Sequence, residues 1–315
     1  MSDAPPVEAL GLVKIYRETT AVDHVDLVVE RGDVFGYLGP NGAGKTTSLR
    51  MLLGLIRPTE GSARLFGRDP LVEGAKALEG VAGFVEGPRF YPYLSGRRNL
   101  QLLADYDEPS SRPRIDEVLE LVELRDRAKD RVGGYSHGMR QRLGIAASLL
   151  RQPRLLLLDE PTTGLDPAGM RDMRELVRRL AGEGLTILLS SHLLYEVEEL
   201  CNRVAIIRKG SIIYQGELSD LLATAASGYR LRALEPERAR TALLAQPGIA
   251  DVELRDGDLR FTADDEAVAA LSVALGRAGV AFTALAPENV SLEELFLGMT
   301  GGESSDHDSV AAVAV

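Results

Sequence analysis

Apolar and polar positions alternate with different periods along the chain, and near the N-terminus they predict strands. Short runs rich in β-branched residues at 7–12, 25–29 and 34–38 are separated by turn-forming residues. The third run leads into a glycine-rich loop, after which residues 47–55 have the apolar spacing of a helix. A strand, a glycine-rich turn and a helix in this order are the context that a phosphate-binding loop requires.

The spacing of apolar residues changes at about residue 89. From there to residue 150 apolar residues recur at helical spacing and no strand pattern occurs, which predicts a helical insertion. Strands and helices then alternate, which predicts a parallel sheet covered on both faces, followed by a hairpin that turns at Lys209 and Gly210. The expected elements are helices at 99–106, 115–124, 136–150, 168–180 and 193–201, strands at 155–158 and 186–189, and the hairpin at 204–214.

Beyond residue 227 the pattern restarts in the order β-α-β-β-α-β, which is typical of a ferredoxin-like module. We therefore expect an α/β domain over residues 1–226, with its helical subdomain at about 89–150, and a small α+β module over residues 227–299. Residues 300–315 begin with glycine, serine and acidic residues and are expected to form a disordered tail. The module's expected elements are strands at 229–234, 251–255, 259–262 and 282–286 and helices at 236–245 and 266–278.

Composition narrows the class of protein. The 36 basic and 47 acidic residues give a formal charge of −11, which argues against a general nucleic-acid binder. No apolar run approaches the roughly 18–20 residues that cross a bilayer, and the first six residues do not resemble a signal peptide, so we expect a cytosolic protein. A single cysteine, Cys201, cannot form an internal disulfide and is interpreted as a small buried hydrophobe.

The glycine-rich loop fits the pattern G-x-x-x-x-G-K-[ST] at every fixed position. Its glycines allow successive backbone amides to face a phosphate, and the helix that follows adds its positive end. Lys45 is expected on the β- and γ-phosphates of ATP and Thr46 on Mg²⁺; the alternative, a plain glycine-rich turn, does not explain the flanking strand and helix. The nucleotide-binding residues expected here are Gly39, Pro40, Asn41, Gly42, Ala43, Gly44, Lys45, Thr46 and Thr47.

Two carboxylates, Asp159 and Glu160, directly follow the buried apolar strand at 155–158. Ligands of an open α/β sheet bind at the carboxyl ends of its strands, and neighbouring side chains there point in different directions. We therefore expect Asp159 to bind Mg²⁺ and Glu160 to act on the attacking water as general base. Two solvated charges at the start of a loop are the alternative for such a pair taken in isolation.

A stretch shortly before this strand, residues 134–142, resembles the signature motif of ABC-type ATPases, which usually reads Leu-Ser-Gly-Gly-Gln. Ser136 and Gly138 match it, whereas His137 replaces the first glycine. Ser136 also precedes a helix, where its hydroxyl and the first amides form an anion site, although an ordinary helix cap explains the same residue. The resemblance implies an ABC-type P-loop fold in which this site binds the γ-phosphate held by a second copy of the chain.

Further motifs follow in the order found in that family. Residues 161–166, ending at Asp166, resemble the loop that touches the opposite protomer, and His192 resembles the histidine that contacts the γ-phosphate. Tyr16 occupies the place of an aromatic residue that stacks on adenine. Taken alone, His192 could be a capping or core histidine and Tyr16 a packing residue.

One position departs from the family pattern. The glutamine that usually reaches Mg²⁺ at the hinge before the helical insertion is replaced by Glu86. A carboxylate accepts hydrogen bonds but donates none, so contact with the metal is chemically reasonable whereas direct contact with the γ-phosphate is not. Glu86 is therefore expected either to bind Mg²⁺ or to form a hinge that works differently.

Three stretches resemble the ATPases of bacterial drug-resistance exporters of the daunorubicin and bacitracin type. They are residues 135–142, 90–96 and 291–297. The resemblance implies a cytoplasmic-face subunit that meets the membrane only through a separate transmembrane permease. Phe90, Tyr91 and Tyr93 are either a docking patch for that permease or a local hydrophobic cluster. A regulatory ABC ATPase without a transport role remains the alternative; a single phosphate loop and a short insertion disfavour ribosomal and DNA-repair relatives.

Overall fold

The computed structural model describes residues 4–107, 109–225, 228–287 and 292–300. The chain divides into two compact units, Met1–Leu218 and Ser219–Val315. The division falls at helix α8 (Leu218–Ala225), shortly before the domain boundary expected at residue 227. The tail expected at 300–315 lies, apart from Thr300, outside the described residues.

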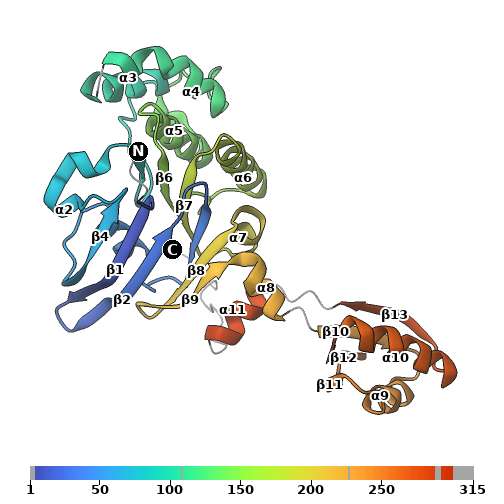
Figure 1. Ribbon diagram of the computed structural model, residues 1–315. Coiled ribbons are helices and arrows are strands. Elements are labelled where there is room, and N and C mark those ends of the chain that lie inside the picture. Colours follow the sequence, from blue (N-terminus) through green and yellow to red (C-terminus); the bar gives the residue numbers. More distant parts are fainter. Residues whose placement is uncertain (1–3, 108, 226–227, 288–291, 301–315) are drawn as a thin grey trace, which may run out of the picture. The chain divides into compact units, whose positions relative to one another are not determined.

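The centre of the first unit is a six-stranded sheet with the order β5-β6-β7-β3-β8-β9 (Figure 1). All neighbours are parallel except β8 and β9, which form the predicted hairpin. Every residue of β3, β6 and β7 is buried, which explains the apolar runs at 34–38, 155–158 and 187–189. The strands are β3 (Val34–Leu38), β5 (Val81–Phe84), β6 (Leu155–Asp159), β7 (Thr186–Ser191), β8 (Arg203–Arg208) and β9 (Ser211–Glu217).

Strand order brings three loops together. Because β7 lies between β3 and β6 and all three are parallel, their carboxyl ends meet at one edge of the sheet. The glycine-rich loop follows β3, Glu160 follows β6, and His192 follows β7. This edge therefore gathers residues that are distant in the sequence.

A second sheet, with the order β2-β1-β4, is antiparallel and shares a core with helix α1 (Lys45–Leu52). Its strands are β1 (Val7–Tyr16), β2 (Thr19–Val29) and β4 (Glu60–Leu65). β1 and β2 are longer than predicted, because the residues up to the turn between Tyr16 and Thr19 also pair. The sequence pattern missed β4 and β5, since β4 buries few of its residues and β5 has only four.

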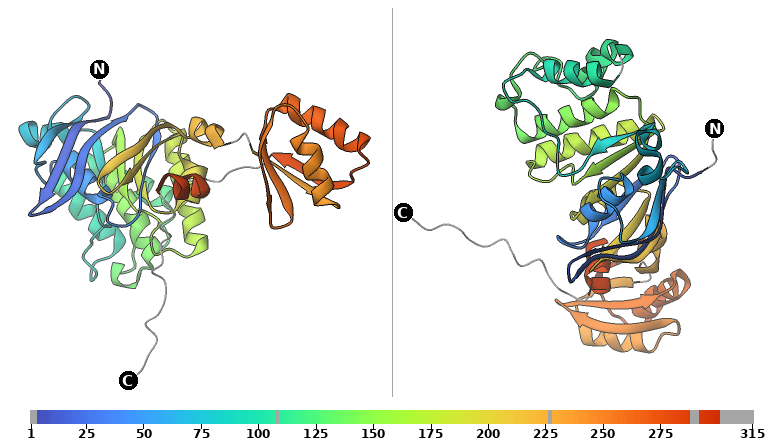
Figure 2. Two further views of the ribbon diagram at one scale, coloured as in Figure 1. Left: turned by 90° about the horizontal axis from the view of Figure 1, so that it is seen from below. Right: turned by 90° about the vertical axis from the view of Figure 1, so that its left-hand side faces the viewer.

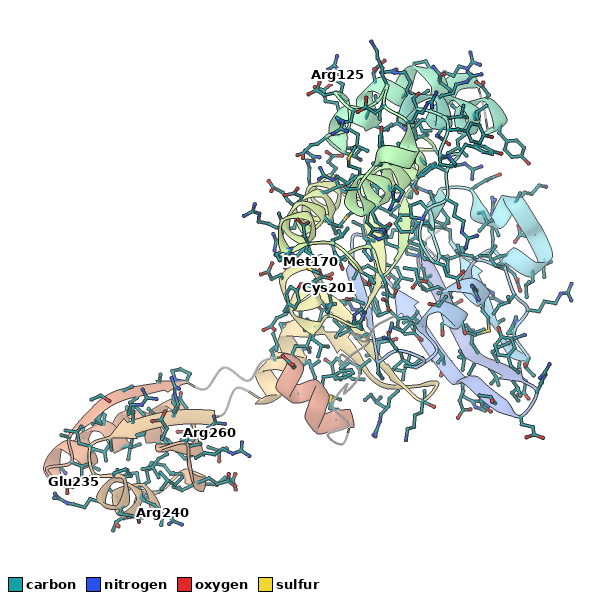
Figure 3. The ribbon with its side chains drawn as sticks, turned by 180° about the vertical axis from the view of Figure 1, so that it is seen from behind. Arg125, Met170, Cys201, Glu235, Arg240 and Arg260 are labelled. Carbon is teal, nitrogen blue, oxygen red and sulfur yellow. The ribbon has the colours of Figure 1, made fainter. Side chains whose placement is uncertain are left out.

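The helical insertion contains α3 (Gly96–Asp107), α4 (Ile115–Leu121) and α5 (His137–Leu149), close to the predicted segments. Helices α6 (Pro167–Gly182) and α7 (Leu194–Leu200) also lie where the apolar spacing predicted them. The short α2 (Pro70–Glu73) was not predicted. Cys201, at the end of α7 (Figure 3), is a buried free thiol as predicted, and burial raises its pKa.

The second unit contains an antiparallel sheet with the order β11-β12-β10-β13 and a core shared with α9 and α10 (Figure 2). The hairpin β11–β12 and the strands on either side of each helix follow the β-α-β-β-α-β order. The elements are β10 (Gly228–Ala233), α9 (Pro236–Leu244), β11 (Ile249–Arg255), β12 (Asp258–Ala263), α10 (Asp265–Arg277), β13 (Phe282–Pro287) and α11 (Leu292–Thr300). Throughout the described segments, no helix is both long and apolar enough to span a membrane.

Candidate nucleotide-binding site

The glycine-rich loop connects β3 to α1 in a tight backbone path. A Cβ atom at Gly39 would lie 2.5 Å from the Ile207 carbonyl oxygen, and one at Gly44 would lie 2.5 Å from that of Ala21. Gly44 also has a left-handed φ of 109° and gives α1 no side-chain cap. The first amides of α1 are thus left uncapped by a side chain next to the loop, which is the arrangement that suits a phosphate.

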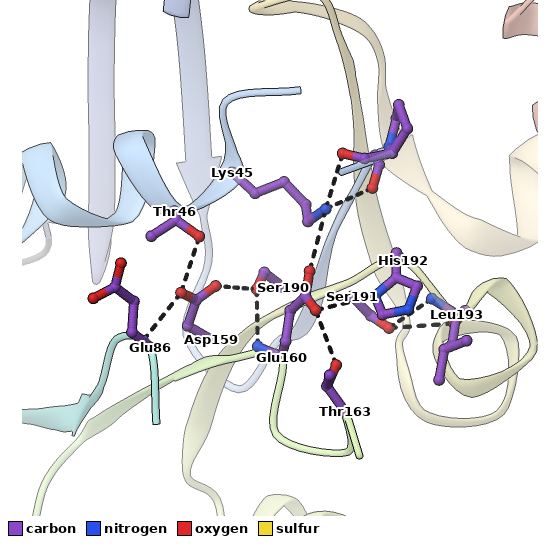
Figure 4. Close-up of polar contacts among 12 residues, drawn as sticks. Lys45, Thr46, Glu86, Asp159, Glu160, Thr163, Ser190, Ser191, His192 and Leu193 are labelled. Atoms are coloured by element: carbon purple, nitrogen blue, oxygen red, sulfur yellow. Dashed lines mark hydrogen bonds and ion pairs between the residues drawn. The ribbon is translucent and has the colours of Figure 1, made fainter. Parts of the chain in front are cut away.

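Lys45 is the first residue of α1, and its side chain is 5% exposed. Its ammonium group donates hydrogen bonds to the carbonyl oxygens of Gly39 at 2.6 Å and Pro40 at 3.2 Å, and lies 3.4 Å from Glu160 Oε1 (Figure 4). Burial lowers the pKa of Lys45, and the nearby Glu160 carboxylate opposes that change. The lysine therefore lies across the loop beside the catalytic candidate.

Asp159 is buried and accepts three hydrogen bonds through its carboxylate. Thr46 Oγ1 donates to Oδ2 at 3.0 Å, Ser190 Oγ to Oδ1 at 2.6 Å, and the Glu86 amide to Oδ2 at 3.3 Å. Ser190 Oγ also accepts from the Glu160 amide at 3.0 Å, so one hydroxyl links both acidic residues. Ser190 lies two residues before His192, and the sequence gave no signal for its contact with these acids.

The donor set around Asp159 fits Mg²⁺. Thr46 and Asp159 offer hydroxyl and carboxylate oxygens, and Mg²⁺ is usually held by one or two such groups together with substrate phosphates and water. Within the described chain, no group of three or more His, Cys, Asp or Glu side chains is arranged to hold a metal by itself. The residues therefore suit a metal that arrives with a nucleotide.

Glu160 is oriented by three side chains from different segments. Thr163 Oγ1 donates to Oε2 at 2.9 Å, His192 Nδ1 lies 3.0 Å from the same oxygen, and Lys45 approaches Oε1. Burial acts to raise the pKa of Glu160, but Thr163, Lys45 and His192 outweigh it and hold the pKa below its ordinary value. The carboxylate is therefore ionised at neutral pH, and its oxygens can accept a hydrogen bond from a water molecule.

Glu86 enters the site in two ways. Its amide donates to Asp159, whereas its carboxylate forms an ion pair with Arg50 of α1. The sequence offered no direct signal for Arg50, although it lies four residues after Thr46 and therefore on the same helical face.

A cavity of about 470 Å³ joins these groups to the helical insertion. Gln141 on α5 is only 4% exposed, and its Oε1 atom is buried without a hydrogen-bond partner. His137, which replaces a signature glycine, lies 3.4 Å from the Gln141 amide nitrogen. The lining residues are Thr46, Glu86, Gly87, His137, Gln141, Asp159, Glu160, Thr163 and Gly164.

Other predicted site residues do not line this cavity. Ser136 caps α5 by accepting from the Met139 amide at 3.2 Å, and Asp166 caps α6 by accepting from the Gly169 amide at 2.9 Å. Tyr16 is 45% exposed at the end of β1, with Lys14 Nζ 5.1 Å from its ring centroid. Hydrogen bonds and ion pairs thus bring Lys45, Thr46, Asp159, Glu160 and His192 together, although Lys45 and His192 do not themselves line the cavity. Tyr16, Ser136, Gly138 and Asp166 do not line it either.

Comparison with known proteins identifies the family of the chain. The family model described as ABC transporter matches residues 22–163. The bacitracin transport ATP-binding protein BcrA of Bacillus licheniformis is 38% identical, and the match covers 94% of this chain and 97% of BcrA. The daunorubicin/doxorubicin resistance ATP-binding protein DrrA of Streptomyces peucetius is 37% identical, and the match covers 97% of this chain and 96% of DrrA. A solved ATP-binding subunit of an ABC transporter is 29% identical, covers 70% of this chain and 92% of that chain, and has a TM-score of 0.61.

The chain therefore belongs to the family of ABC transporter ATP-binding proteins, whose members hydrolyse ATP. Its relatives include ATP-binding proteins named for bacitracin transport and for daunorubicin/doxorubicin resistance, and the similarity extends into the second unit.

Proposed function

We propose that this chain supplies the ATPase activity of an exporter whose membrane-spanning part is a separate polypeptide. Two observations support the proposal: relatives named for bacitracin transport and daunorubicin resistance align over nearly the whole chain, and the described residues contain no candidate membrane span. On this proposal the chain works at the cytoplasmic face of the membrane. The exported compound belongs to the drug, antibiotic or lipid-like class.

The position of Glu160 is the observation that supports ATP hydrolysis at this site. Its carboxylate has a lowered pKa, is held by Thr163 and His192, and lies next to the loop lysine. Glu160 then takes the proton of the attacking water, while His192 keeps the carboxylate turned toward the loop. Lys45 and the backbone amides of residues 41–47 bind the β- and γ-phosphates of ATP, and Tyr16 stacks on the adenine.

Thr46 and Asp159 are the residues proposed to hold Mg²⁺. When bound, Mg²⁺ supplies positive charge to the β- and γ-phosphate oxygens. Ser190 keeps Asp159 in place through its 2.6 Å hydrogen bond, so the metal ligand is oriented before the nucleotide arrives.

We propose that a second copy of the chain completes the site. Ser136, Gly138 and Asp166 lie outside the cavity that holds Glu160, at the starts of α5 and α6. These helix starts present amides and a partial positive charge, which suit the γ-phosphate of the partner's nucleotide. ATP then lies between the two copies, and its hydrolysis lets them separate.

The proposed docking site for the membrane subunit is a groove of about 400 Å³ between β5 and the helical insertion. It opens next to the hinge that carries Glu86, and its apolar lining includes Phe84, Pro88, Phe90 and Leu103. Tyr91 and Tyr93 lie nearby with 55% and 65% of their surfaces exposed, and they extend the apolar surface. A helix seated here would sense movement of the hinge.

The two-copy proposal is tested by ATP-dependent dimerisation of the hydrolysis-deficient Glu160→Gln protein. Size exclusion with light scattering should show a dimer with ATP and a monomer without it. Adding Ser136→Asp should abolish the dimer, because the new charge repels the γ-phosphate while aspartate still caps α5. Ser136→Asn caps the helix without the charge and should retain the dimer. Dimers of equal strength in all three proteins would refute the role of Ser136.

The exporter proposal is tested by looking for an adjacent reading frame with about six apolar spans and purifying its product together with the chain. Candidate compounds of the drug and antibiotic class should then stimulate ATP hydrolysis by the complex. Failure of the two polypeptides to co-purify, with full ATPase activity in the isolated chain, would contradict the proposal.

A further inference from the structure

The hinge carboxylate of Glu86 has a partner on α1. Three carboxylates, Glu86, Asp159 and Glu160, line the same cavity, and their mutual repulsion favours separation. Arg50 lies one helical turn after Thr46 and forms an ion pair with Glu86. The Lys45 ammonium is shared between Glu160 and two carbonyl oxygens, so the Glu86 charge is balanced separately.

The backbone conformation at Glu86 and Gly87, which form the hinge, directs the amide and the carboxylate of Glu86 to different partners. Glu86 has a φ of 66° and Gly87 one of 86°, so two consecutive residues adopt the left-handed conformation. The Glu86 amide donates to Asp159 Oδ2 at 3.3 Å, and in Figure 4 the side chain extends away from Asp159, on the side of α1. The amide thus contacts the proposed metal ligand while the carboxylate lies with Arg50.

We propose that Arg50 is a positioning residue that keeps the Glu86 carboxylate off the metal and ties the hinge to the phosphate-loop helix. The inference rests on the proposed Mg²⁺ site at Thr46 and Asp159. It chooses between the two roles left open for Glu86: the hinge acts through its amide and an ion pair, and the carboxylate is not a metal ligand while Arg50 is present.

The strength of this pair suits a hinge that has to move. The Arg50 side chain is 33% exposed and that of Glu86 is 56% exposed, and ion pairs in such surroundings bias a conformation by a factor of about five at most. Such a bias favours the conformation in which the hinge is paired with Arg50, and the binding energy of a docked partner is enough to shift it. Without the guanidinium, the carboxylate is free to turn toward Asp159 and increase the negative charge at the metal site.

The experiment measures Mn²⁺ affinity of the full chain with saturating ADP, by the electron paramagnetic resonance signal of free Mn²⁺. We expect Arg50→Met to bind Mn²⁺ about threefold or more tightly than the parent protein, because the freed carboxylate joins the site. Removing a cation also raises Mn²⁺ affinity by simple electrostatics. The same substitution is therefore made in a Glu86→Gln background, where the gain should shrink to that smaller electrostatic part.

Matched variants separate the outcomes. Arg50→Lys keeps the charge and should bind Mn²⁺ like the parent, and so should Arg68→Met, which removes an exposed arginine 3.0 Å from Glu79 in a different part of the unit. Equal gains from Arg50→Met with and without Glu86 would overturn the proposal. Asp159→Asn should lose Mn²⁺ binding in every background; if it does not, the proposed metal site itself fails, whatever the Arg50 variants do.

Discussion

The two units of the chain bury different kinds of side chain. Among the described residues, all but one of the buried polar or charged side chains lie in the first unit, including Lys45, Asp159 and Glu196. The exception is Asp258 in the second unit, where Arg232 donates two hydrogen bonds to its carboxylate at 2.7 and 2.8 Å. The second unit otherwise joins an antiparallel sheet to two helices through an apolar core.

This contrast suggests that the first unit carries out the chemistry and that the second unit has a structural role. Burying a polar group costs free energy unless it is hydrogen-bonded, so a cluster of them at one sheet edge is maintained at the expense of stability. Glu160 and Glu86 also adopt positive φ angles there, but Asp251 and Asp256 of the second unit do so as well, so this backbone feature does not distinguish the units. The second unit shows no comparable cluster within its described residues, and we expect it to contribute contacts rather than catalysis.

The largest effect is expected from Glu160→Gln, which removes the proposed general base but keeps an amide of similar shape. Turnover should fall by about 10²–10⁴-fold, whereas ATP binding should persist, because Lys45 and the loop amides remain. Steady-state hydrolysis and equilibrium nucleotide binding test both parts. The same substitution at Glu237, exposed on α9 of the second unit, should change neither. Turnover near that of the parent would mean that another group accepts the proton.

A core substitution in the second unit tests whether the two units are energetically separate. Phe261 is 2% exposed, and its ring lies 5.9 Å from that of Tyr229, so Phe261→Ala should destabilise that unit by about 3–5 kcal/mol. Calorimetry should show one unfolding transition shifted to lower temperature, with ATP affinity unchanged. The matched Phe35→Ala on β3 should shift the other transition and weaken ATP binding. A single shared transition would show that the units unfold together.

The smallest predicted effect concerns Glu196, a buried carboxyl on α7 that accepts from the Thr162 hydroxyl. Burial raises the pKa of Glu196 above its ordinary value of 4.5, and the Thr162 and Arg174 side chains oppose this only in part. Folding therefore favours the protonated form, and the stability it contributes is lost as pH rises through the folded-state pKa. Glu196→Gln keeps an acceptor without the charge.

We accordingly expect Glu196→Gln to match the parent below pH 4.5 and to melt about 1–3 °C higher at neutral pH. Thermal melts across pH 4–8 check the sign. A variant that is less stable than the parent at neutral pH would indicate that the ionised carboxylate is compensated inside the fold.

Much of the site was predictable from local sequence. The phosphate loop, Asp159 and Glu160 each lie beside a strand whose apolar run is visible, and Ser136 precedes a clear helical pattern. The lengths of the strands were less predictable, because the outer parts of β1 and β2 mix apolar residues such as Val13 and Val22 with polar ones, and pairing between the two strands extends them. β5 also escaped detection; a Cβ at its Gly83 would lie 1.8 Å from the Leu157 carbonyl oxygen, a closeness that only the packed sheet reveals.

The sequence by itself thus determined the class of protein, its elements and the residue types that handle phosphate, because these depend on short-range patterns. Only the tertiary structure decided which groups meet. It placed β7 between β3 and β6, joined Ser190 to both acids, and directed the Glu86 carboxylate to Arg50. The physical reason is that hydrogen bonds and ion pairs depend on distances of a few ångströms between segments that no sequence period connects.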